Sequence, residues 1–315
     1  MEKIRIGIVG YGNIGKGVEL AIARNEDMEL KAVFTRRNPE SVSVQTEGVK
    51  VVHMDDVLSM KDDIDVMMLC GGSATDLPVM GPEMAAHFNT IDSFDTHAKI
   101  PEYFANVDAA AKAAGNIGII SVGWDPGMFS LNRIYAESIL VQGSTYTFWG
   151  KGVSQGHSDA LRQIDGVEDA IQYTIPASRH IQKIRTDYDF VPQKNEMHIR
   201  ECFVAIKKGA NKKQIEQQIK NMENYFKGQE VQIHFVKKEL IEKLKKRMYH
   251  AGQIIGSGKD MSAQIRFYVK MKSNPTFTAN IMTKYINAIK HLPFGVYSVA
   301  DIAPRYLLED YESLL

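Results

Sequence analysis

The sequence has few cysteines and no long apolar run. Its 315 residues include only Cys70 and Cys202, which are too few for a disulfide framework and lack the spacing of a metal site. A reducing compartment fits this composition. No apolar stretch reaches the length of a membrane span, and the chain opens on a strand pattern instead of a signal peptide. We therefore expect a cytoplasmic protein without a metal.

An excess of charge of either sign is also missing. Lys plus Arg and Asp plus Glu both number 38, so the formal net charge is zero, which argues against general attraction to nucleic acid or membrane. The one basic cluster, Lys237-Lys238 with Lys243 to Arg247, has no interleaved aromatic residues and indicates a solvated helix surface. The chain also lacks repeats. Its length and its 44% hydrophobic content fit two globular domains.

What the chain does have is a glycine fingerprint near its start. An apolar run, Ile4 to Val9, leads into Gly10, Gly12 and Gly15, and a helical pattern follows. This order predicts a strand, a tight turn and a helix whose N-terminal amides face a pyrophosphate. The alternative is an ordinary glycine-rich turn in a parallel sheet. We expect the loop to bind a dinucleotide through five residues, namely Gly10, Tyr11, Gly12, Asn13 and Ile14.

The end of the predicted second strand, Leu30 to Phe34, indicates which cofactor fits. It is followed by Thr35, Arg36 and Arg37, where an enzyme that prefers NAD usually has a carboxylate for the ribose 2′-hydroxyl. A hydroxyl and two guanidinium groups suit a 2′-phosphate by charge and geometry. We therefore expect NADP, although a solvated basic turn is the alternative.

Strand and helix patterns alternate through the first 122 residues. We predict further strands at 50–53, 64–69, 89–92 and 117–122, with helices at 56–60, 83–88 and 101–114. Sustained alternation of this kind predicts an α/β fold, a Rossmann-type doubly wound parallel sheet. The buried run Ile64 to Leu69 ends in a loop of small residues that we expect to line the nicotinamide: Cys70, Gly71, Gly72, Ser73, Ala74 and Thr75. Cys70 is interpreted as a buried strand residue and not as a nucleophile.

Three carboxylates follow successive predicted strands. Asp92 ends the fifth strand, Asp95 follows it, and Asp125 comes after the sixth. Because the carboxyl ends of parallel strands share one rim, these side chains would lie beside the hydride carrier and suit a substrate with an ammonium group. A single Asp at such a position is more often a helix cap or a turn former, so we expect at least one of the three to be structural.

The pattern changes in the second half. Strand-like alternation occurs at 144–149, 231–235 and 265–271, an apolar β-rich run occurs at 202–206, and an amphipathic helix is predicted over 211–226. Strands with one polar face predict a mostly antiparallel sheet backed by helices. We therefore expect an NADP-binding domain over residues 1–122 and a second domain of α+β type, for substrate binding and dimerisation, over 123–275.

As a set, the motifs resemble the meso-diaminopimelate D-dehydrogenase family over nearly the whole chain. WDPGMFS (124–130) and SQGHSDA (154–160) are the most specific stretches. The other matching stretches are IGIVGYGNIGKGVE, TRR, LCGGSATD, TIDSFDTHAKIP, SVGWDPGMFSLNR, TFWGKGVSQGHSDALR, GVEDAIQYTIP and SNPTFTA.

The resemblance implies reversible, NADP-dependent oxidative deamination at the D-centre of meso-2,6-diaminopimelate. The products are L-2-amino-6-oxopimelate, ammonia and NADPH, and the reverse reaction supplies a precursor of lysine and the cell wall. The resemblance also implies a homodimer and a C-terminal segment, 276–315, that packs back on the cofactor domain.

The resemblance implies the following site residues. Asp92 and Asp125 face the reacting amine, with Trp124 and Asp95 close by. The L-amino-acid end and the rest of the substrate contact Phe148, Gln155, Gly156, His157, Thr174, Arg200, His250 and Asn274. The chain departs from the family before His250, where it reads Lys245 to Gly252 (KKRMYHAG) in place of a His-Thr-Gly-Met-Pro-His-Gly-Gly stretch.

Two other functions were weighed. One is a different NADP-dependent reductase of the aspartate pathway, related to dihydrodipicolinate reductase or homoserine dehydrogenase, which WDPGMFS and SQGHSDA argue against. The other is a non-catalytic NADP-binding redox sensor, in which the strand-end aspartates are structural. Such a sensor binds the cofactor but turns over no amino acid.

Overall fold

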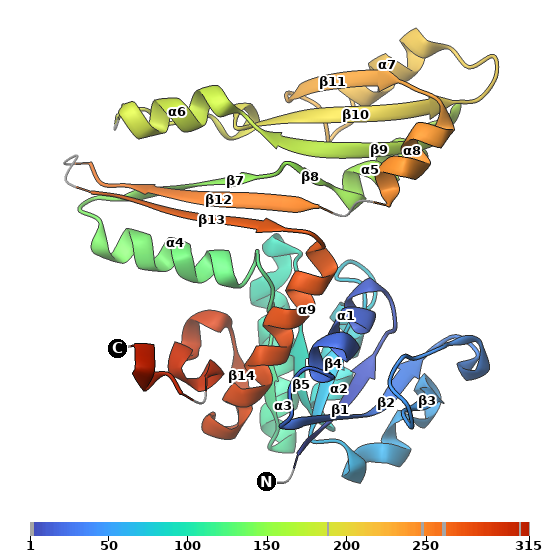
Figure 1. Ribbon diagram of the computed structural model, residues 1–315, viewed down its shortest axis with the longest axis vertical. Helices are drawn as coiled ribbons and strands as arrows, with labels where there is room; N and C mark the ends of the chain where they lie inside the picture. The colour runs from blue at the N-terminus through green and yellow to red at the C-terminus, as the bar shows by residue number, and fades with distance from the viewer. Residues whose placement is uncertain (1–2, 188, 247–248, 260–262, 309, 315) are drawn as a thin grey trace. The chain divides into compact units, whose positions relative to one another are not determined.

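The chain forms two compact units (Figure 1). A computed structural model describes residues 3–187, 189–246, 249–259, 263–308 and 310–314. One unit consists of Met1–Leu131 and Pro275–Leu315, and the other of Asn132–Asn274. The division falls after Leu131 and not after Val122, because Leu131 packs against the core of the first unit. We call the two units the cofactor unit and the inserted unit.

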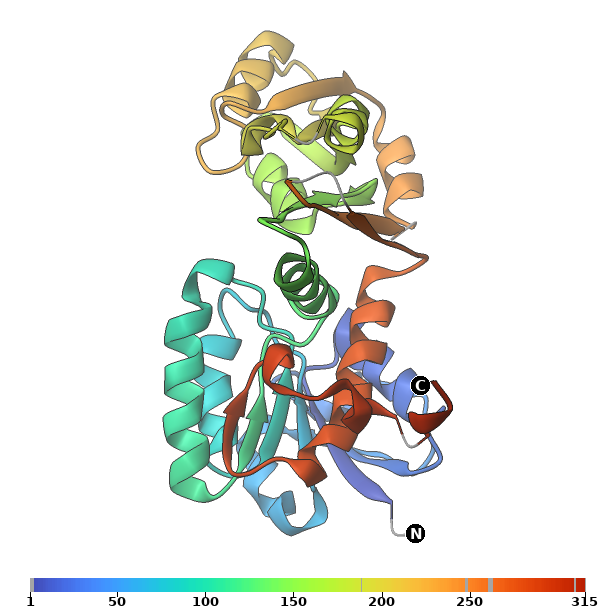
Figure 2. The same cartoon turned by 90° about the vertical axis from the view of Figure 1, so that its left-hand side faces the viewer.

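The cofactor unit is built on a seven-stranded parallel sheet (Figure 2). The strand order is β14-β6-β5-β4-β1-β2-β3, and neighbouring strands pair in parallel. The strands are β1 (Ile4–Val9), β2 (Met28–Thr35), β3 (Lys50–His53), β4 (Val66–Leu69), β5 (Asn89–Asp92), β6 (Ile117–Ile119) and β14 (Gly295–Tyr297). The predicted doubly wound parallel sheet is confirmed.

Both faces of this sheet are covered by helices. The α-helices of the unit are α1 (Asn13–Ile22), α2 (Leu77–Ala85), α3 (Ile100–Ala114) and most of α9 (Asn274–Tyr285). Side chains of β4 alternate between two cores: Met68 packs with α1 and α9, whereas Met67 and Leu69 pack with α2 and α3. A strand buried on both faces reads as a continuous apolar run, which is why its sequence was recognisable.

Short 3-10 helices complete the cofactor unit. They are η1 (Pro39–Ser41), η2 (Met54–Asp63), η3 (His97–Lys99), η5 (Ile286–His291), η6 (Val299–Asp301), η7 (Pro304–Leu307) and η8 (Glu312–Leu314). The helix predicted at 56–60 is part of η2. The helix predicted at 83–88 begins earlier, at Leu77, and carries Pro at one of its first two positions, where the missing N–H costs nothing.

The segment after residue 275 completes the cofactor unit. A Cβ atom added to Gly17 of α1 would lie 2.8 Å from the Cβ of Ala279 in α9, so the two helices are in close contact. Met282 and Tyr285 of α9 belong to the same core as β1. The backbone then adds β14 beside β6 as the edge strand of the sheet.

The inserted unit contains two sheets, whereas the sequence predicted one. One sheet has the order β11-β10-β9-β8 and the other β13-β12-β7. Their strands are β7 (Ser144–Trp149), β8 (Gly152–Val153), β9 (Val167–Pro176), β10 (His198–Ile206), β11 (Glu230–Phe235), β12 (His250–Ser257) and β13 (Gln264–Met271). All pairs are antiparallel except β10 with β11, so the mostly antiparallel character is as predicted.

Helices surround these two sheets. They are α4 (Met128–Ile139), which crosses the boundary between the units, α5 (Gln155–Arg162), α6 (Ser178–Thr186), α7 (Lys212–Lys220) and α8 (Lys238–Lys245), with η4 (Lys194–Glu196). The periodicity did not predict β12. All eight of its residues are buried, so it has no polar face and no alternation.

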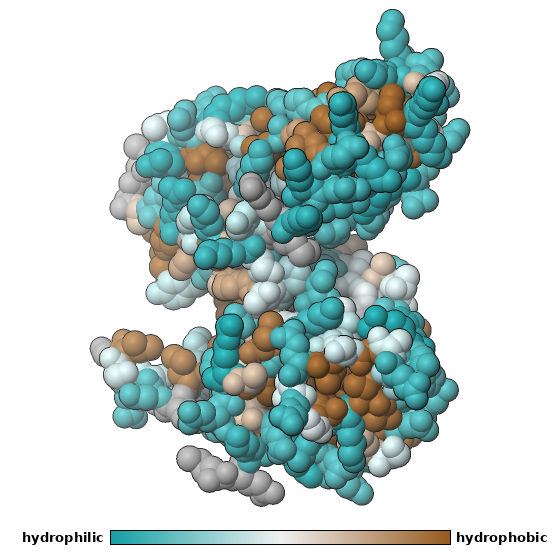
Figure 3. Space-filling view, turned by 45° about the vertical axis from the view of Figure 1, so that its right-hand side comes forward, coloured by the Kyte–Doolittle hydropathy of each residue, from teal (hydrophilic) through white to brown (hydrophobic). Residues whose placement is uncertain are grey.

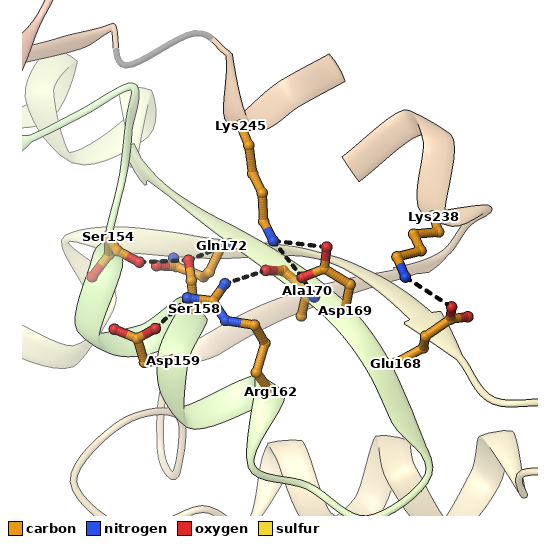
Figure 4. A network of polar contacts seen from close by, with 10 residues as sticks. All are labelled: Ser154, Ser158, Asp159, Arg162, Glu168, Asp169, Ala170, Gln172, Lys238 and Lys245. Atoms are coloured by element: carbon orange, nitrogen blue, oxygen red, sulfur yellow. Dashed lines mark hydrogen bonds and ion pairs between the residues drawn. The ribbon is translucent and has the colours of Figure 1, made fainter. Parts of the chain in front are cut away.

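Polar side chains fix α5 and α8 onto β9 (Figure 4). Arg162 of α5 donates to the carbonyl oxygen of Ala170 at 2.7 Å and pairs with Asp159. Lys245 of α8 reaches both carboxylate oxygens of the buried Asp169, at 2.6 and 2.7 Å. Residues predicted as a solvated basic helix therefore include one that holds the helix to the sheet.

The surface is mixed in character. Hydrophilic side chains cover much of the face in Figure 3, with hydrophobic patches between them. Among the described residues, no helix is both long and apolar enough to cross a membrane.

Candidate active site

The glycine loop has the shape that a pyrophosphate requires. Gly10 has a φ of +87°, which favours glycine, and its N–H donates to the Phe34 carbonyl oxygen at 3.0 Å. A Cβ atom on Gly15 would lie 2.2 Å from the carbonyl oxygen of Gly10, so α1 can approach the loop only without a side chain there. A Cβ atom on Gly12 would meet nothing within 4 Å. The space above Gly12 is therefore open to a ligand.

A pocket of about 330 Å³ lies at the carboxyl ends of β1, β2 and β4. It is lined by Val9, Gly10, Tyr11, Gly12, Phe34, Thr35, Arg36, Arg37, Met54, Cys70, Gly71, Gly72, Asp76 and Met80. Both loops predicted to hold the cofactor contribute to this pocket. A larger pocket, about 570 Å³, lies at the opposite ends of the strands, near Met28 and Lys50, away from the rim where α/β sheets bind ligands.

The two predicted arginines are both held at this pocket. Arg36 is 70% exposed and pairs with Asp76 at 2.9 Å. Arg37 donates from Nη2 to the carbonyl oxygen of Tyr11 at 3.1 Å, and its N–H donates to Thr35 Oγ1, also at 3.1 Å. The Tyr11 hydroxyl donates in turn to the buried Glu19 of α1. These contacts bring two cations beside the glycine loop, so the residues fit a dinucleotide with an additional phosphate.

Asp92 lies at the end of β5 and is 1% exposed. Its Oδ1 accepts from the N–H groups of Phe94 and Ser121 at 2.9 and 3.0 Å, and its Oδ2 accepts from the Tyr103 hydroxyl at 2.6 Å. Burial raises the pKa of Asp92 to about 6, although these three donors oppose the rise. Asp92 therefore joins the ends of β5 and β6 as well as carrying charge.

Cys70 lines the pocket and follows Leu69, which pairs in register with Asp92. Burial, and then the charge of Asp92, raises the pKa of its thiol to about 12, so the thiol stays protonated. Cys70 differs from the expected buried strand residue, because β4 ends at Leu69 and Cys70 keeps partial exposure. The exposed Asp95 is tied to the same loop, since its N–H donates to Ser73 Oγ at 3.1 Å. Ala74 and Thr75 lie further along that loop, exposed and outside the pocket lining.

Trp124 and Asp125 follow β6 on the same rim. Trp124 is 7% exposed and packs edge-on against Phe129, with ring centroids 5.3 Å apart. Its backbone forms an isolated bridge with Gly127, which closes a tight turn around Asp125. Asp125 is half-buried, so its carboxylate is more accessible than that of Asp92.

The inserted unit carries a second polar site across adjacent strands. Thr174 of β9 pairs in register with Arg200 of β10, and Arg200 Nη1 donates to Thr174 Oγ1 at 2.7 Å. Arg200 Nε donates to Gln229 Oε1 at 3.0 Å. Burial lowers the pKa of the guanidinium, and no carboxylate among the described residues forms an ion pair with it. The site thus holds a partly desolvated cation that suits an anionic ligand.

Three histidines lie near this arginine site, and burial lowers the pKa of each. Burial first and the Arg200 charge second lower the pKa of His157 to about 4 and that of His198 to about 3. Burial also lowers the pKa of His250. The His250 ring packs over Gly152, where a Cβ atom would lie 2.1 Å from its Cδ2, and Gly152 pairs with Thr174. His250 therefore lies next to the threonine that binds Arg200.

The first turn of α5 faces open space. Gln155 and Gly156 are exposed, and a Cβ atom on Gly156 would meet nothing within 4 Å. Ser154 precedes the helix and shares a hydrogen bond of 2.9 Å with His157 Nδ1. Asn274 is the half-buried first residue of α9.

Comparison with known proteins agrees with this arrangement. Residues 123–273 match the model of the diaminopimelic acid dehydrogenase C-terminal domain. The meso-diaminopimelate D-dehydrogenase of Ureibacillus thermosphaericus is 54% identical over 93% of this chain and 90% of its own. The chain belongs to the meso-diaminopimelate D-dehydrogenase family.

Solved structures of this family have the same fold. A multiple mutant of the Clostridium tetani enzyme, crystallised with DAP, is 45% identical and has a TM-score of 0.91, covering 99% of this chain and 98% of its own. An engineered D-amino acid dehydrogenase bound to NADP⁺ is 37% identical, with a TM-score of 0.84 and the same coverage.

Phe148, expected at the family's substrate site, is a core residue whose ring centroid lies 5.9 Å from that of His198. Phe148 is fully buried in a hydrophobic cluster with Ile184, Met197 and Ile255. Successive residues of a strand point to opposite faces, so β7 presents Trp149 on the other side. Trp149 is half-buried, stacks on His198 with centroids 5.3 Å apart, and donates its N–H to His198 Nε2 at 2.8 Å. Both Phe148 and Trp149 therefore lie beside His198, Phe148 from the core and Trp149 from a half-buried position.

Sequence reasoning missed Gln229, His198, Trp149 and Tyr103. No motif marks Gln229 or Tyr103, because each meets its partner only through the tertiary fold. Trp149 could have been weighed equally with Phe148, since a strand pattern alone does not say which face is the core. Arg247 and Met248, part of the departure from the family pattern, lie outside the described residues.

Proposed function

We propose that this chain catalyses NADP-dependent oxidative deamination of the D-centre of meso-2,6-diaminopimelate. The reaction consumes substrate, NADP⁺ and water, and releases L-2-amino-6-oxopimelate, ammonium, NADPH and a proton. It is reversible, and in the direction of amination it serves lysine and cell-wall precursor synthesis. The observation that carries the proposal is that Cys70 lines the dinucleotide pocket directly after Leu69, which pairs in register with the buried Asp92 at the same strand-end rim.

The residues of the pocket fit NADP. Gly10, Tyr11, Gly12, Asn13 and Ile14 would hold the pyrophosphate, because the turn leaves the space above Gly12 open. Thr35, Arg36 and Arg37 would hold the 2′-phosphate, and the loop Cys70 to Thr75 would line the nicotinamide. When bound, NADP⁺ accepts the hydride from the D-centre.

The rim supplies negative charge for the reacting amine. Asp125 is the accessible carboxylate and would contact the amine, with Trp124 shaping its turn. The buried Asp92 adds a second negative charge. The low dielectric around it strengthens its electrostatic stabilisation of the developing iminium cation. Asp95 lies beside the same loop. These carboxylates are already in place to stabilise the developing positive charge, so the protein needs little reorganisation during the reaction.

The inserted unit would recognise the L-amino-acid end. Arg200 would bind the distal carboxylate, and Thr174 holds the guanidinium from one side. The exposed first turn of α5, at Gln155 and Gly156, offers backbone N–H groups. His157, His250, Asn274 and Trp149 would contribute the remaining contacts. A substrate with one carboxylate leaves Arg200 unpaired, which explains selectivity for a diaminodicarboxylate.

We also propose a homodimer that works in the cytoplasm. Four large apolar side chains at the end of α4 and just after it are more than half exposed: Ile134, Tyr135, Ile139 and Val141. Such a patch suits an interface with a second copy across a two-fold axis. The two cysteines are both free, as a reducing compartment requires.

Replacement of Asp125 tests the proposal. The variant D125A should lose at least 99% of its turnover of meso-diaminopimelate, because the amine loses its accessible counter-charge. NADPH binding, followed by nicotinamide fluorescence, should be unchanged. Asp56→Ala, at an exposed position of η2, is the control for loss of one negative charge. Normal turnover by D125A would remove Asp125 from the active site.

Turnover of the diaminopimelate stereoisomers separates the dehydrogenase from both alternatives. A redox sensor would bind NADP⁺ but reduce none when offered the three diaminopimelate stereoisomers in turn. The dehydrogenase should respond only to isomers with a D-centre, and best to the meso isomer. A reductase of another substrate would bind NADPH and leave all three isomers unchanged.

A further inference from the structure

Gln229 is a polar residue in contact with Arg200, and the proposed function assigns it no role. It lies directly before β11, and its Oε1 accepts from Arg200 Nε at 3.0 Å. Its backbone is fixed, since its N–H donates to the carbonyl oxygen of the fully buried Phe226 at 3.0 Å. The preceding residue is held as well, because Asn195 Nδ2 donates to the Gly228 carbonyl oxygen at 3.0 Å. The backbone that carries the Gln229 acceptor is thus held by two hydrogen bonds.

Three adjacent strands position the guanidinium. Thr174 on β9 accepts from Nη1, and Gln229 at the start of β11 accepts from Nε, so Arg200 on the middle strand β10 is held from both sides. Two hydrogen bonds from different edges of a planar group fix its plane as well as its position. Among the described residues, no acceptor is bonded to Nη2. That edge remains available for a ligand.

The chemistry of the acceptors matters as much as their placement. Both are neutral, so they orient Arg200 without cancelling its charge. A carboxylate in the place of the Gln229 amide would form an ion pair with the guanidinium and compete with any anionic ligand. The neutral amide therefore keeps a half-buried cation charged and unpaired, which is the state that binds a carboxylate best.

We propose that Gln229 is a positioning residue that sets specificity for the distal carboxylate of the substrate. It acts through Arg200, by holding the guanidinium plane and by leaving its charge for the ligand. The inference rests on the proposed function, in which Arg200 binds that carboxylate. It predicts that the charge of residue 229, more than its shape, decides substrate affinity.

Two substitutions at this position separate charge from shape. Gln229→Glu keeps the size and shape of the side chain but pairs with Arg200, so the KM for meso-diaminopimelate should rise about 100-fold. Gln229→Leu removes the hydrogen bond without adding a competitor, and the KM should rise about 3- to 10-fold. The KM for NADP⁺ should stay within twofold in both variants. A purely steric role predicts the reverse order, with Gln229→Glu the milder change.

The control is Gln232→Glu, which makes the same charge change on an exposed side chain of β11 and should leave all constants unchanged. If folded Gln229→Glu and Gln229→Leu both keep the normal KM for meso-diaminopimelate, the positioning role is wrong. If Gln229→Glu does not fold, the KM of Gln229→Leu decides the positioning role. A raised KM for meso-diaminopimelate supports the role, and an unchanged KM contradicts it. Arg200→Met is measured in parallel: if it leaves the KM unchanged, the failure lies in the proposed function and not in Gln229.

Discussion

Asp92 combines a structural and an electrostatic role in one side chain. Its three donors come from the end of β5, from α3 and from the end of β6, so the carboxylate joins three elements under the rim. Its burial favours the protonated form and raises its pKa to about 6. The residue therefore carries charge at neutral pH at a cost to stability, a compromise common at active sites.

This gives a prediction for pH dependence. The folded state holds the Asp92 proton more tightly than the unfolded state, so the free energy of unfolding falls as pH rises from about 4 to about 6. Asp92→Asn abolishes this titration, and its amide can accept from both N–H groups and donate to Tyr103. At pH 7 the variant should be about 2–3 kcal/mol more stable than the parent, and at pH 4 about equal.

Urea unfolding at the two pH values measures this difference, and Asp56→Asn, at an exposed position, is the control. Turnover by Asp92→Asn should fall strongly, because the negative charge beneath the amine is gone. A stability difference that is the same at pH 4 and pH 7 would contradict the assigned titration.

At the scale of elements, two glycines between β1 and α1 have different roles. Gly12 leaves space for a ligand, and Gly15 lets α1 pack close to the loop. Gly15→Ala should destabilise the cofactor unit by about 2–3 kcal/mol, because its Cβ would lie 2.2 Å from a backbone oxygen that cannot move away easily. Gly12→Ala should change stability by less than about 0.5 kcal/mol, since its Cβ meets nothing, but should raise the Kd for NADP⁺ at least about tenfold.

Thermal unfolding and fluorescence titration with NADPH test the pair. The result that would refute the assignment is equal destabilisation by both substitutions, or normal cofactor binding by Gly12→Ala. The two variants control for each other, because each adds one methyl group at the start of α1, Gly12 at its N-cap and Gly15 in its first turn.

Elements with a simple pattern could be predicted from the sequence. The strands expected at Ile4 to Val9, 50–53 and 89–92 have those bounds in the structure, because short β-prone segments alternate there with helical patterns and turn residues. The fully buried β12 could not be recognised, and neither could the division of the second half into two sheets. Periodicity records which residues face water, and it carries no information about which strands become neighbours.

The same limit applies to the site. The glycine loop and the arginines after β2 were predictable because the residues that hold a cofactor lie close together in the sequence. Arg200, Thr174 and Gln229 are far apart in the chain and become neighbours only through sheet register. From the residues alone they could not have been selected, and for Thr174 and Arg200 only the family resemblance indicated a role.

At the scale of the whole molecule, the exposed apolar side chains of α4, with Val141 just after it, predict the assembly state. Ile134→Asp combined with Ile139→Asp places two charges on side chains that are 55% and 53% exposed, so the fold should persist while a dimer through this surface is lost. Sedimentation velocity should show half the mass of the parent protein.

Leu58→Asp, on η2 of the cofactor unit, is the matched control, since its side chain is 49% exposed and lies outside the patch. A parent protein that is monomeric at micromolar concentration, or a double variant that sediments like the parent, would show that this patch is not the interface.

The discontinuous cofactor unit has a consequence for how the protein is made. β14 and α9 come from the segment after residue 275, yet they supply the edge strand and part of the core of a sheet that begins at Ile4. On the ribosome, the first 131 residues emerge long before these two elements. Until then, the edge of β6 lacks its partner strand and the core on the α9 side of the sheet is incomplete. The inserted unit is complete earlier, so it can fold first, and nascent chains arrested before α9 should be readily cleaved by protease within β1 to β6.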